Sequence, residues 1–160
     1  MMYLHHITAT KPTMPHAAAE DLLQLGDVCL GHATRRTANA LTRHYNAALA
    51  PVGLEVTQFT TLCVIGTGRT ESSAALAAAV GVDRSTLARN LVLLRRDGLV
   101  QAEPAGGRRH RHHLTPAGHA RLVEAVILWR GAQDRLSARL GAPAVAQSLD
   151  TLARLRKAAD

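Results

Sequence analysis

The segment from Ser72 to Leu114 constrains the fold of this chain most strongly, because helix signals and turn signals alternate closely within it. Apolar residues at helical spacing predict a short, alanine-rich helix over residues 73–80. Gly81 supplies a turn, and Asp83 is the expected N-cap of a second helix that runs to Arg96. Two helices joined by so short a turn are typical of a helix-turn-helix.

A hairpin is predicted directly after the second helix. Residues 99–103 and 110–114 are short extended runs, and the sequence Pro-Ala-Gly-Gly at 104–107 makes the turn between them. Such a hairpin can lie as a wing along a minor groove, where narrow A·T tracts attract arginine. The alternative is a solvated, charged hairpin that has no partner. The arginines expected to act from this wing are Arg108, Arg109 and Arg111.

The rest of the chain has the pattern of helices. They are expected over about 20–49, 57–65, 116–140 and 144–158. Thr57 and Thr115 are the expected N-caps of the second and third of these, Pro116 suits a first helical position, and Gly131 is a weak point. Residues 1–18 show no helical period and are expected to form a mobile tail. The predicted fold class is therefore mainly α with a small β-hairpin.

The charge of the chain indicates a polyanionic partner. The formal net charge is +7, the isoelectric point is about 10.7, and 17 of the 19 basic residues are arginine. From Arg84 to His113, seven arginines stand against two acidic residues, so much of the positive charge is local. Arginine suits phosphate and guanine because its planar group donates hydrogen bonds in pairs. The alternative is a generally arginine-rich proteome, in which a basic balance carries little information.

One face of the helix after Asp83 is suited to a DNA groove. Leu87, Leu91 and Leu94 recur at helical spacing and are expected to pack on the preceding helices. In a helix-turn-helix, the N-terminal half of the second helix enters the major groove. The residues expected to contact DNA from this helix are Arg84, Ser85, Thr86, Arg89 and Asn90. The hydroxyl residues are expected to act as short donors, and Arg89 is long enough to fork onto a guanine edge.

Other classes of protein find little support in the sequence. No nucleophile–base arrangement, phosphate loop or metal motif is evident, so no enzyme activity, cofactor or metal is expected. Cys29 and Cys63 do not make a disulfide framework. No run approaches the roughly 18 apolar residues of a membrane span. The start does not resemble a signal peptide, whether it is Met1 or Met14. We therefore expect a cytoplasmic protein that does not contact membranes.

Several stretches, taken in order, resemble the MarR family of bacterial transcriptional regulators. They are residues 35–59, 82–100, 107–118 and 128–133, and the resemblance extends over about residues 20–158. It implies a homodimer that binds a palindromic operator in double-stranded DNA with two winged helices. It also implies a repressor, released from DNA by a small aromatic or anionic effector or by an oxidant.

The resemblance implies a single MarR-like domain over residues 19–160. Residues 54–115 would form the DNA-binding lobe, and residues 19–50 and 116–159 would form the dimerisation helices. In the family an effector pocket lies between the first helix and that lobe. By position alone, its possible lining residues here are His32, Arg36 and Trp129. The alternative for the arginine is a salt bridge in the dimer arm.

Two departures from the family pattern bear on function. An acidic residue commonly stands two positions before the wing arginine, and this chain has Gly106 there. One branch senses organic peroxides with a first-helix cysteine, at the position of Gly31 in this chain, whereas Cys29 lies on a different face of the helix. A redox-sensing regulator based on Cys29 remains an alternative. A winged-helix module that binds protein instead of DNA is another.

Overall fold

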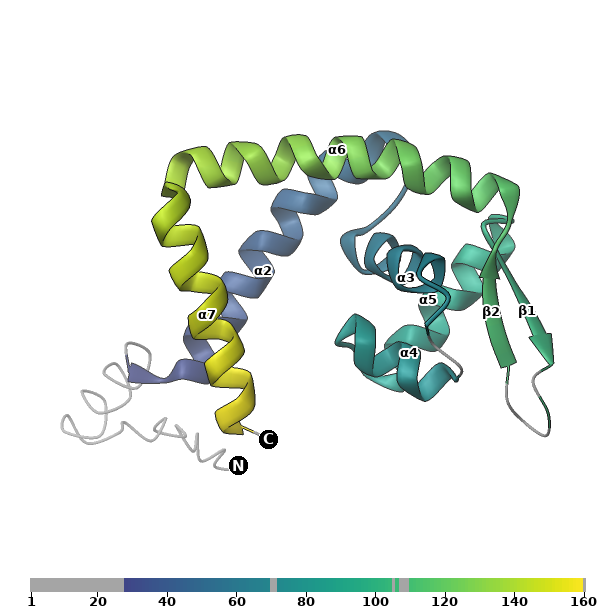
Figure 1. The fold of residues 1–160 in the computed structure, drawn as a ribbon, viewed down its shortest axis with the longest axis horizontal. Helices are drawn as coiled ribbons and strands as arrows, with labels where there is room; N and C mark the ends of the chain where they lie inside the picture. Colours follow the sequence, from purple (N-terminus) through teal and green to yellow (C-terminus); the bar gives the residue numbers. More distant parts are fainter. Residues whose placement is uncertain (1–27, 70–71, 105, 107–109, 160) are drawn as a thin grey trace, which may run out of the picture. The chain divides into compact units, whose positions relative to one another are not determined.

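The computed structural model describes residues 28–69, 72–104, 106 and 110–159, and the expected tail lies outside them. The chain divides into two compact units, Met1–Ala40 and Leu41–Asp160. The boundary falls inside α2 (Leu30–Leu49). The elements that follow are η1 (Ala50–Val52), α3 (Val56–Gly66), α4 (Ser73–Val80), α5 (Arg84–Arg96), β1 (Val100–Pro104), β2 (His110–Leu114), α6 (Pro116–Leu140) and α7 (Ala142–Ala159). The described part of the chain consists of helices and one two-stranded hairpin (Figure 1), which confirms the predicted fold class of a mainly α protein with a small β-hairpin.

α4 and α5 form the predicted helix-turn-helix. The Ser72 hydroxyl caps α4 by accepting a hydrogen bond from the backbone N–H of Ala75 at 3.2 Å. Gly81 ends that helix with a φ of 79°, a left-handed conformation that glycine adopts without steric cost. The Asp83 carboxylate caps α5 by accepting from the N–H of Thr86 at 2.8 Å. Residues close in sequence therefore define both helix starts and the turn between them.

The start of α3 corrects the prediction that Thr57 is its N-cap. Glu55 occupies that position, and its backbone N–H donates to Oε1 of Gln58 at 2.9 Å. The N–H of Val56 donates to Oδ1 of Asn46, 2.7 Å away. These two side chains satisfy N–H donors at the helix start, so the helix begins one residue before Thr57.

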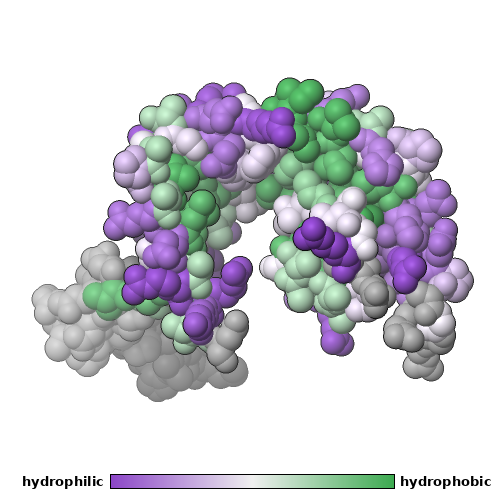
Figure 2. Space-filling view, viewed as in Figure 1, coloured by the Kyte–Doolittle hydropathy of each residue, from purple (hydrophilic) through white to green (hydrophobic). Residues whose placement is uncertain are grey.

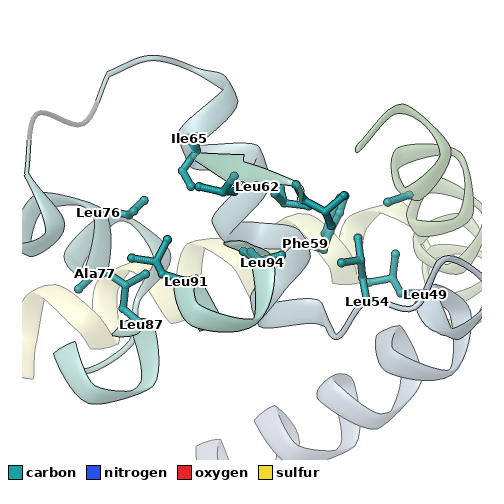
Figure 3. Close-up of a cluster of buried hydrophobic side chains, with 13 residues drawn as sticks. Leu49, Leu54, Phe59, Leu62, Ile65, Leu76, Ala77, Leu87, Leu91 and Leu94 are labelled. Carbon is teal, nitrogen blue, oxygen red and sulfur yellow. The ribbon is translucent and has the colours of Figure 1, made fainter. Parts of the chain in front are cut away.

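The core of the second unit lies where α3, α4 and α5 meet (Figure 3). The predicted leucine face of α5 is confirmed, because Leu87, Leu91 and Leu94 are only 2%, 8% and 1% exposed. They pack with Leu62 of α3 and Leu76 of α4, which are 0% and 1% exposed. Burial of each such side chain contributes roughly 1.5–3 kcal/mol. The core therefore holds α5 in one orientation and leaves its opposite face outward.

The hairpin follows α5 after a short turn and lies beside it (Figure 1). β1 and β2 are antiparallel, with Val100 opposite Leu114. β1 begins one residue later than predicted, because Leu99 belongs to the turn. Leu99 is 3% exposed, and its N–H bonds to the carbonyl of Leu94 at the end of α5. The hairpin is thus joined to the helix-turn-helix by a buried residue.

α6 begins against the same turn. The Thr115 hydroxyl caps the helix, accepting from the N–H of Gly118 at 2.9 Å and donating to the carbonyl of Gly98 at 2.7 Å. Gly118 approaches the preceding turn so closely that an added Cβ would clash with the carbonyl oxygen of Leu99. Only glycine fits at this contact, which joins the start of α6 to the base of the hairpin.

The last two helices agree with the prediction except at one boundary. α6 continues through Gly131 without a break, and Gly141 then separates it from α7 with a φ of 82°. α7 starts at Ala142, two residues earlier than predicted. Pro143 lies in its first turn, where a missing N–H removes no intrahelical hydrogen bond.

Polar contacts hold the end of α2 against α6 within the second unit. Nε2 of His44 lies 3.1 Å from the carbonyl oxygen of Ala132. Arg121 of α6 donates from Nη1 to the carbonyl of Val52 at 2.6 Å, which satisfies a backbone acceptor in η1. α6 therefore contacts the rest of the second unit at two places: at the end of α2 with η1, and at the base of the hairpin.

Large apolar side chains reach the surface of α6 and α7. Figure 2 shows hydrophobic atoms at the surface over α6, where Val123 and Ile127 are 64% and 66% exposed. On α7, Leu149 and Leu152 are 64% and 48% exposed and lie three residues apart, hence on one face. Among the described residues, no single helix has the length and apolar character of a membrane span, although α2–η1 and α3 meet that test as a pair bent by 73°.

Candidate nucleic-acid interface

The outward face of α5 carries a short arginine-bearing surface. Arg84, Ser85 and Arg89 are exposed, and Thr86 is half-buried. Ser85, Thr86 and Arg89 occupy this face because the leucines of α5 hold the other face in the core. Arg84, the first residue of α5, is exposed but lies on the side of Leu87 and Leu91, with which it lines a hollow. Four of the five α5 residues predicted to contact DNA are thus at least partly exposed, in the helix that the hairpin flanks (Figure 1).

Asp83 organises the hydroxyl groups at this end of α5. Its carboxylate accepts hydrogen bonds from the hydroxyls of Ser85 and Thr86, the latter at 2.6 Å, besides capping the Thr86 N–H. The Ser85 bond, and then those of Thr86, hold the pKa of Asp83 well below its usual range. The carboxylate is therefore ionised at neutral pH, and both hydroxyl protons are directed toward it.

Sequence reasoning found this cap but missed its side-chain partners. It treated Ser85 and Thr86 as free donors, whereas their protons are donated to Asp83. The signal was present, because hydroxyl residues two and three positions after a capping aspartate lie within reach of its carboxylate. Arg89 extends the cluster by donating from Nη2 to Oγ1 of Thr86 at 3.2 Å.

Asn90 corrects the predicted set of DNA-facing residues. It is only 7% exposed, although it was placed with the residues of the groove face. The reason is its position: it follows Leu87 by three residues and precedes Leu94 by four, so it lies on the core side of α5. Its Nδ2 atom has no hydrogen-bond partner among the described residues.

One of the three arginines predicted to act from the hairpin, Arg111, lies within the described residues. Arg111 is exposed in β2, directly opposite Glu103 of β1. It belongs to the paired strand rather than to the tip, because β2 already begins at His110. Figure 2 shows hydrophilic surface over these strands. The other two predicted wing residues, Arg108 and Arg109, lie outside the described residues.

A histidine connects the hairpin to the helix-turn-helix. His112 lines a hollow of about 350 Å³ between α4, α5 and the two strands, and its Nε2 is 3.3 Å from Oγ of Ser73. Its Nδ1 has no hydrogen-bond partner within the described ranges. Burial lowers the pKa of His112, and His110, Arg95 and His113 lower it further. The neutral imidazole is therefore favoured at this junction.

The residues predicted for an effector pocket lie on α2 and α6. His32 and Arg36 are exposed on α2, while Trp129 stacks on Phe59 with ring centroids 6.0 Å apart. Their role in effector binding stays a prediction. Trp129 also packs against the buried core, which gives it a structural role of its own.

The cysteines and histidines offer no built metal site in the part of the chain that the structure describes. No group of three or more His, Cys, Asp or Glu side chains there could hold a metal ion. Cys29 and Cys63 are free, half-buried thiols, and burial raises the pKa of Cys63. A raised pKa disfavours the reactive thiolate at Cys63. A redox role for Cys29 stays a prediction.

Comparison with solved structures identifies relatives over most of the chain. No protein-family model and no curated protein sequence matches it significantly. The transcriptional regulator MosR of M. tuberculosis is 42% identical, with a TM-score of 0.73, over 83% of this chain and 98% of its own. The same regulator in complex with DNA is 43% identical, with a TM-score of 0.70, over 82% of this chain and 98% of its own.

Two further relatives were solved alone or with small molecules. A MarR family protein of Mycobacterium tuberculosis in complex with salicylic acid is 30% identical, with a TM-score of 0.61, over 79% of this chain and 95% of its own. The transcriptional repressor CouR is 25% identical, with a TM-score of 0.73, over 83% of this chain and 96% of its own. CouR was also solved with p-coumaroyl-CoA. With this fold and these identities, the chain belongs to the MarR family of winged-helix transcriptional regulators.

Proposed function

We propose that this protein is a homodimeric repressor that binds a palindromic operator in double-stranded DNA and is released by a small aromatic or anionic effector. The observation that carries the proposal is the exposed arginine-bearing face of α5, presented next to the hairpin by a buried leucine core. Positive side chains on the second helix of a helix-turn-helix suit the phosphates and base edges of a major groove. The protein acts in the cytoplasm, by binding and not by catalysis.

The proposed DNA contacts divide into two sets. Arg84, Ser85, Thr86 and Arg89 of α5 face the major groove, and Arg89 reads a base edge. The hairpin arginines Arg108, Arg109 and Arg111 contact the backbone or the minor groove. Residues 54–115 then form the DNA-binding lobe of one domain that spans residues 19–160.

Two further observations support a regulated dimer. The exposed apolar residues of α6 and α7 offer surface that a second copy of the chain would bury. Relatives in complex with DNA, with salicylic acid and with p-coumaroyl-CoA support both an operator and a small effector. We assign the dimerisation helices to residues 19–50 and 116–159.

The test is binding to fluorescent DNA from the region upstream of the gene, measured by anisotropy against scrambled DNA over a series of salt concentrations. We expect the upstream DNA to bind about 1,000-fold or more tightly than the scrambled DNA. We also expect two protomers per site by sedimentation and a steep salt dependence from released counterions. Weak, sequence-blind binding to upstream and genomic fragments alike would contradict the proposal and favour a winged-helix module that binds protein.

Effector release is tested on the same complex. Salicylate and other small aromatic acids are added to protein bound to its operator, with benzyl alcohol as an uncharged aromatic control. We expect an aromatic acid to lower the DNA affinity. Release by peroxide alone, abolished in Cys29→Ser, would instead favour the redox-sensing alternative.

A further inference from the structure

The contacts of Thr86 point to a role distinct from that of its neighbours. We infer that Thr86 is a positioning residue for sequence specificity, which acts on DNA through Arg89 and does not itself donate to a base. This inference rests on the proposed function, because it concerns how the same face of α5 reads DNA. The Thr86 hydroxyl is not a free donor, because its proton is donated to Asp83.

The direction of each hydrogen bond in the cluster follows from its chemistry. Arginine can only donate, and an ionised carboxylate can only accept. The 2.6 Å contact therefore carries the Thr86 hydroxyl proton to Oδ2 of Asp83, and the 3.2 Å contact carries an Arg89 proton to Oγ1 of Thr86. Because its only proton is donated to Asp83, the Thr86 hydroxyl can act only as an acceptor toward other groups. Its oxygen lone pairs are therefore available to accept a hydrogen bond from the Arg89 guanidinium.

Thr86 is a rigid anchor for this contact. Its β-branched side chain has few χ1 rotamers in a helix. Its backbone N–H is also held by Asp83 at 2.8 Å, and the side chain is half-buried. The low pKa of Asp83 keeps the carboxylate ionised through the neutral range, so the orientation of the hydroxyl does not change there.

Anchoring Arg89 prepares it for a base edge. An exposed arginine side chain samples many rotamers and loses that freedom on binding. One Nη2 proton of Arg89 bonds to Thr86, and four N–H groups remain. They include one proton on each terminal nitrogen, the pair that a bidentate contact with guanine O6 and N7 requires. Ordering the side chain before binding favours the specific complex.

The test uses a DNA site selected by the full-length protein from a random pool. Affinities for that site and for scrambled DNA are measured for the parent, Thr86→Val, Thr86→Ser, Arg89→Ala and the double variant Thr86→Val/Arg89→Ala. Valine keeps the β-branched shape and removes the hydroxyl, while serine restores the hydroxyl. Thermal unfolding of each variant checks that the helix is intact.

We expect Thr86→Val to weaken binding to the selected site about 3- to 10-fold, as for loss of one hydrogen bond. Binding to scrambled DNA should change less than about 2-fold, because phosphate contacts do not require an oriented Arg89. Thr86→Ser should recover most of the affinity. In the Arg89→Ala background, Thr86→Val should have no further effect, because the residue through which it acts is gone.

Three outcomes would overturn the inference, and they differ in what else they affect. An equal loss from Thr86→Val with and without Arg89 would mean that Thr86 acts on DNA independently of Arg89. No loss from Thr86→Val on a strongly enriched site would mean that Arg89 needs no anchor. A pool without enrichment would overturn the proposed function and this role together. In the free protein, NMR should show slower rotation of the Arg89 guanidinium in the parent than in Thr86→Val.

Discussion

At the scale of single residues, Asn90 places a carboxamide on the core side of α5. Its neighbours on that side include Leu87 and Leu94, and its Nδ2 is unpaired among the described residues. A buried polar group without a partner costs about 1–3 kcal/mol. The core of the DNA-binding lobe is therefore less stable than an apolar side chain of similar shape would make it.

Asn90→Leu should raise the free energy of unfolding by about 1 kcal/mol, since it replaces the unpaired amide with methyl groups of nearly the same shape. Urea denaturation followed by circular dichroism measures the change. Asn90→Ala is the matched control, because it also removes the amide but leaves a cavity and should not stabilise. The DNA affinity of Asn90→Leu should stay within about 2-fold of that of the parent. A loss of about tenfold would indicate that Asn90 contacts DNA, contrary to its position on the core side.

At the scale of elements, the hairpin contacts α6 and α4 at two different points, besides packing against α3 and α5. Its base joins α6 through the close approach of Gly118 to Leu99, and its inner face meets α4 through His112 and Ser73. Neither contact involves an arginine of the groove face. The orientation of the wing relative to α5 therefore depends on packing that can be changed without altering the DNA contacts.

Gly118→Ala should destabilise the protein by more than about 2 kcal/mol, because the new methyl group meets a backbone carbonyl that cannot move freely. Gly131→Ala in the same helix is the matched control. There the nearest atom to the new Cβ is the end of the Arg135 side chain at 3.5 Å, so alanine should stabilise by about 0.5–1 kcal/mol. Chemical denaturation of both variants measures the difference, and equal effects would contradict the close contact at Leu99.

Acidification should weaken the junction at His112. Because burial lowers its pKa in the folded state, the unfolded chain binds the proton more readily. The stability contributed by the neutral imidazole is present above the ordinary pKa of about 6.5 and is lost as the pH falls from there toward the lower folded value. Arg95 of α5 and His110 and His113 of the same strand add repulsion once His112 is charged.

The measurement is the urea midpoint at several values between about pH 7.5 and 5.5, around the ordinary histidine pKa. The parent should lose more stability than His112→Gln over this window. His119→Gln, which changes an exposed histidine of α6, should follow the parent. Parallel curves for the parent and His112→Gln would show that the junction is not sensitive to the proton.

At the scale of the whole molecule, the exposed apolar residues of α7 bear on assembly. Leu149→Glu should weaken the proposed homodimer, because a charge placed on this face would have to be desolvated in the interface. Sedimentation at micromolar concentration should then show single chains of 17.1 kDa. Gln147→Glu adds the same charge to another exposed face of α7 and should remain dimeric. If Leu149→Glu also stays dimeric, this face lies outside the interface.

The helix-turn-helix was predictable from the sequence because its determinants are local. Gly81 and Asp83 each act within three or four residues of their own position, so capping and turn rules locate the boundary between the two helices. The leucine face of α5 was equally predictable, because helical periodicity alone selects it. The arginine-bearing face then follows as the opposite side.

What the sequence determined by itself is therefore the order of elements, the two faces of α5 and the local positive charge. Only the tertiary structure decided that Gly118 meets Leu99, that His112 meets Ser73, and that Asn90 has no partner within the described residues. The physical reason is sequence separation. Periodicity and capping act over a few residues, whereas these contacts depend on the packing of α4, α5, α6 and the hairpin against one another.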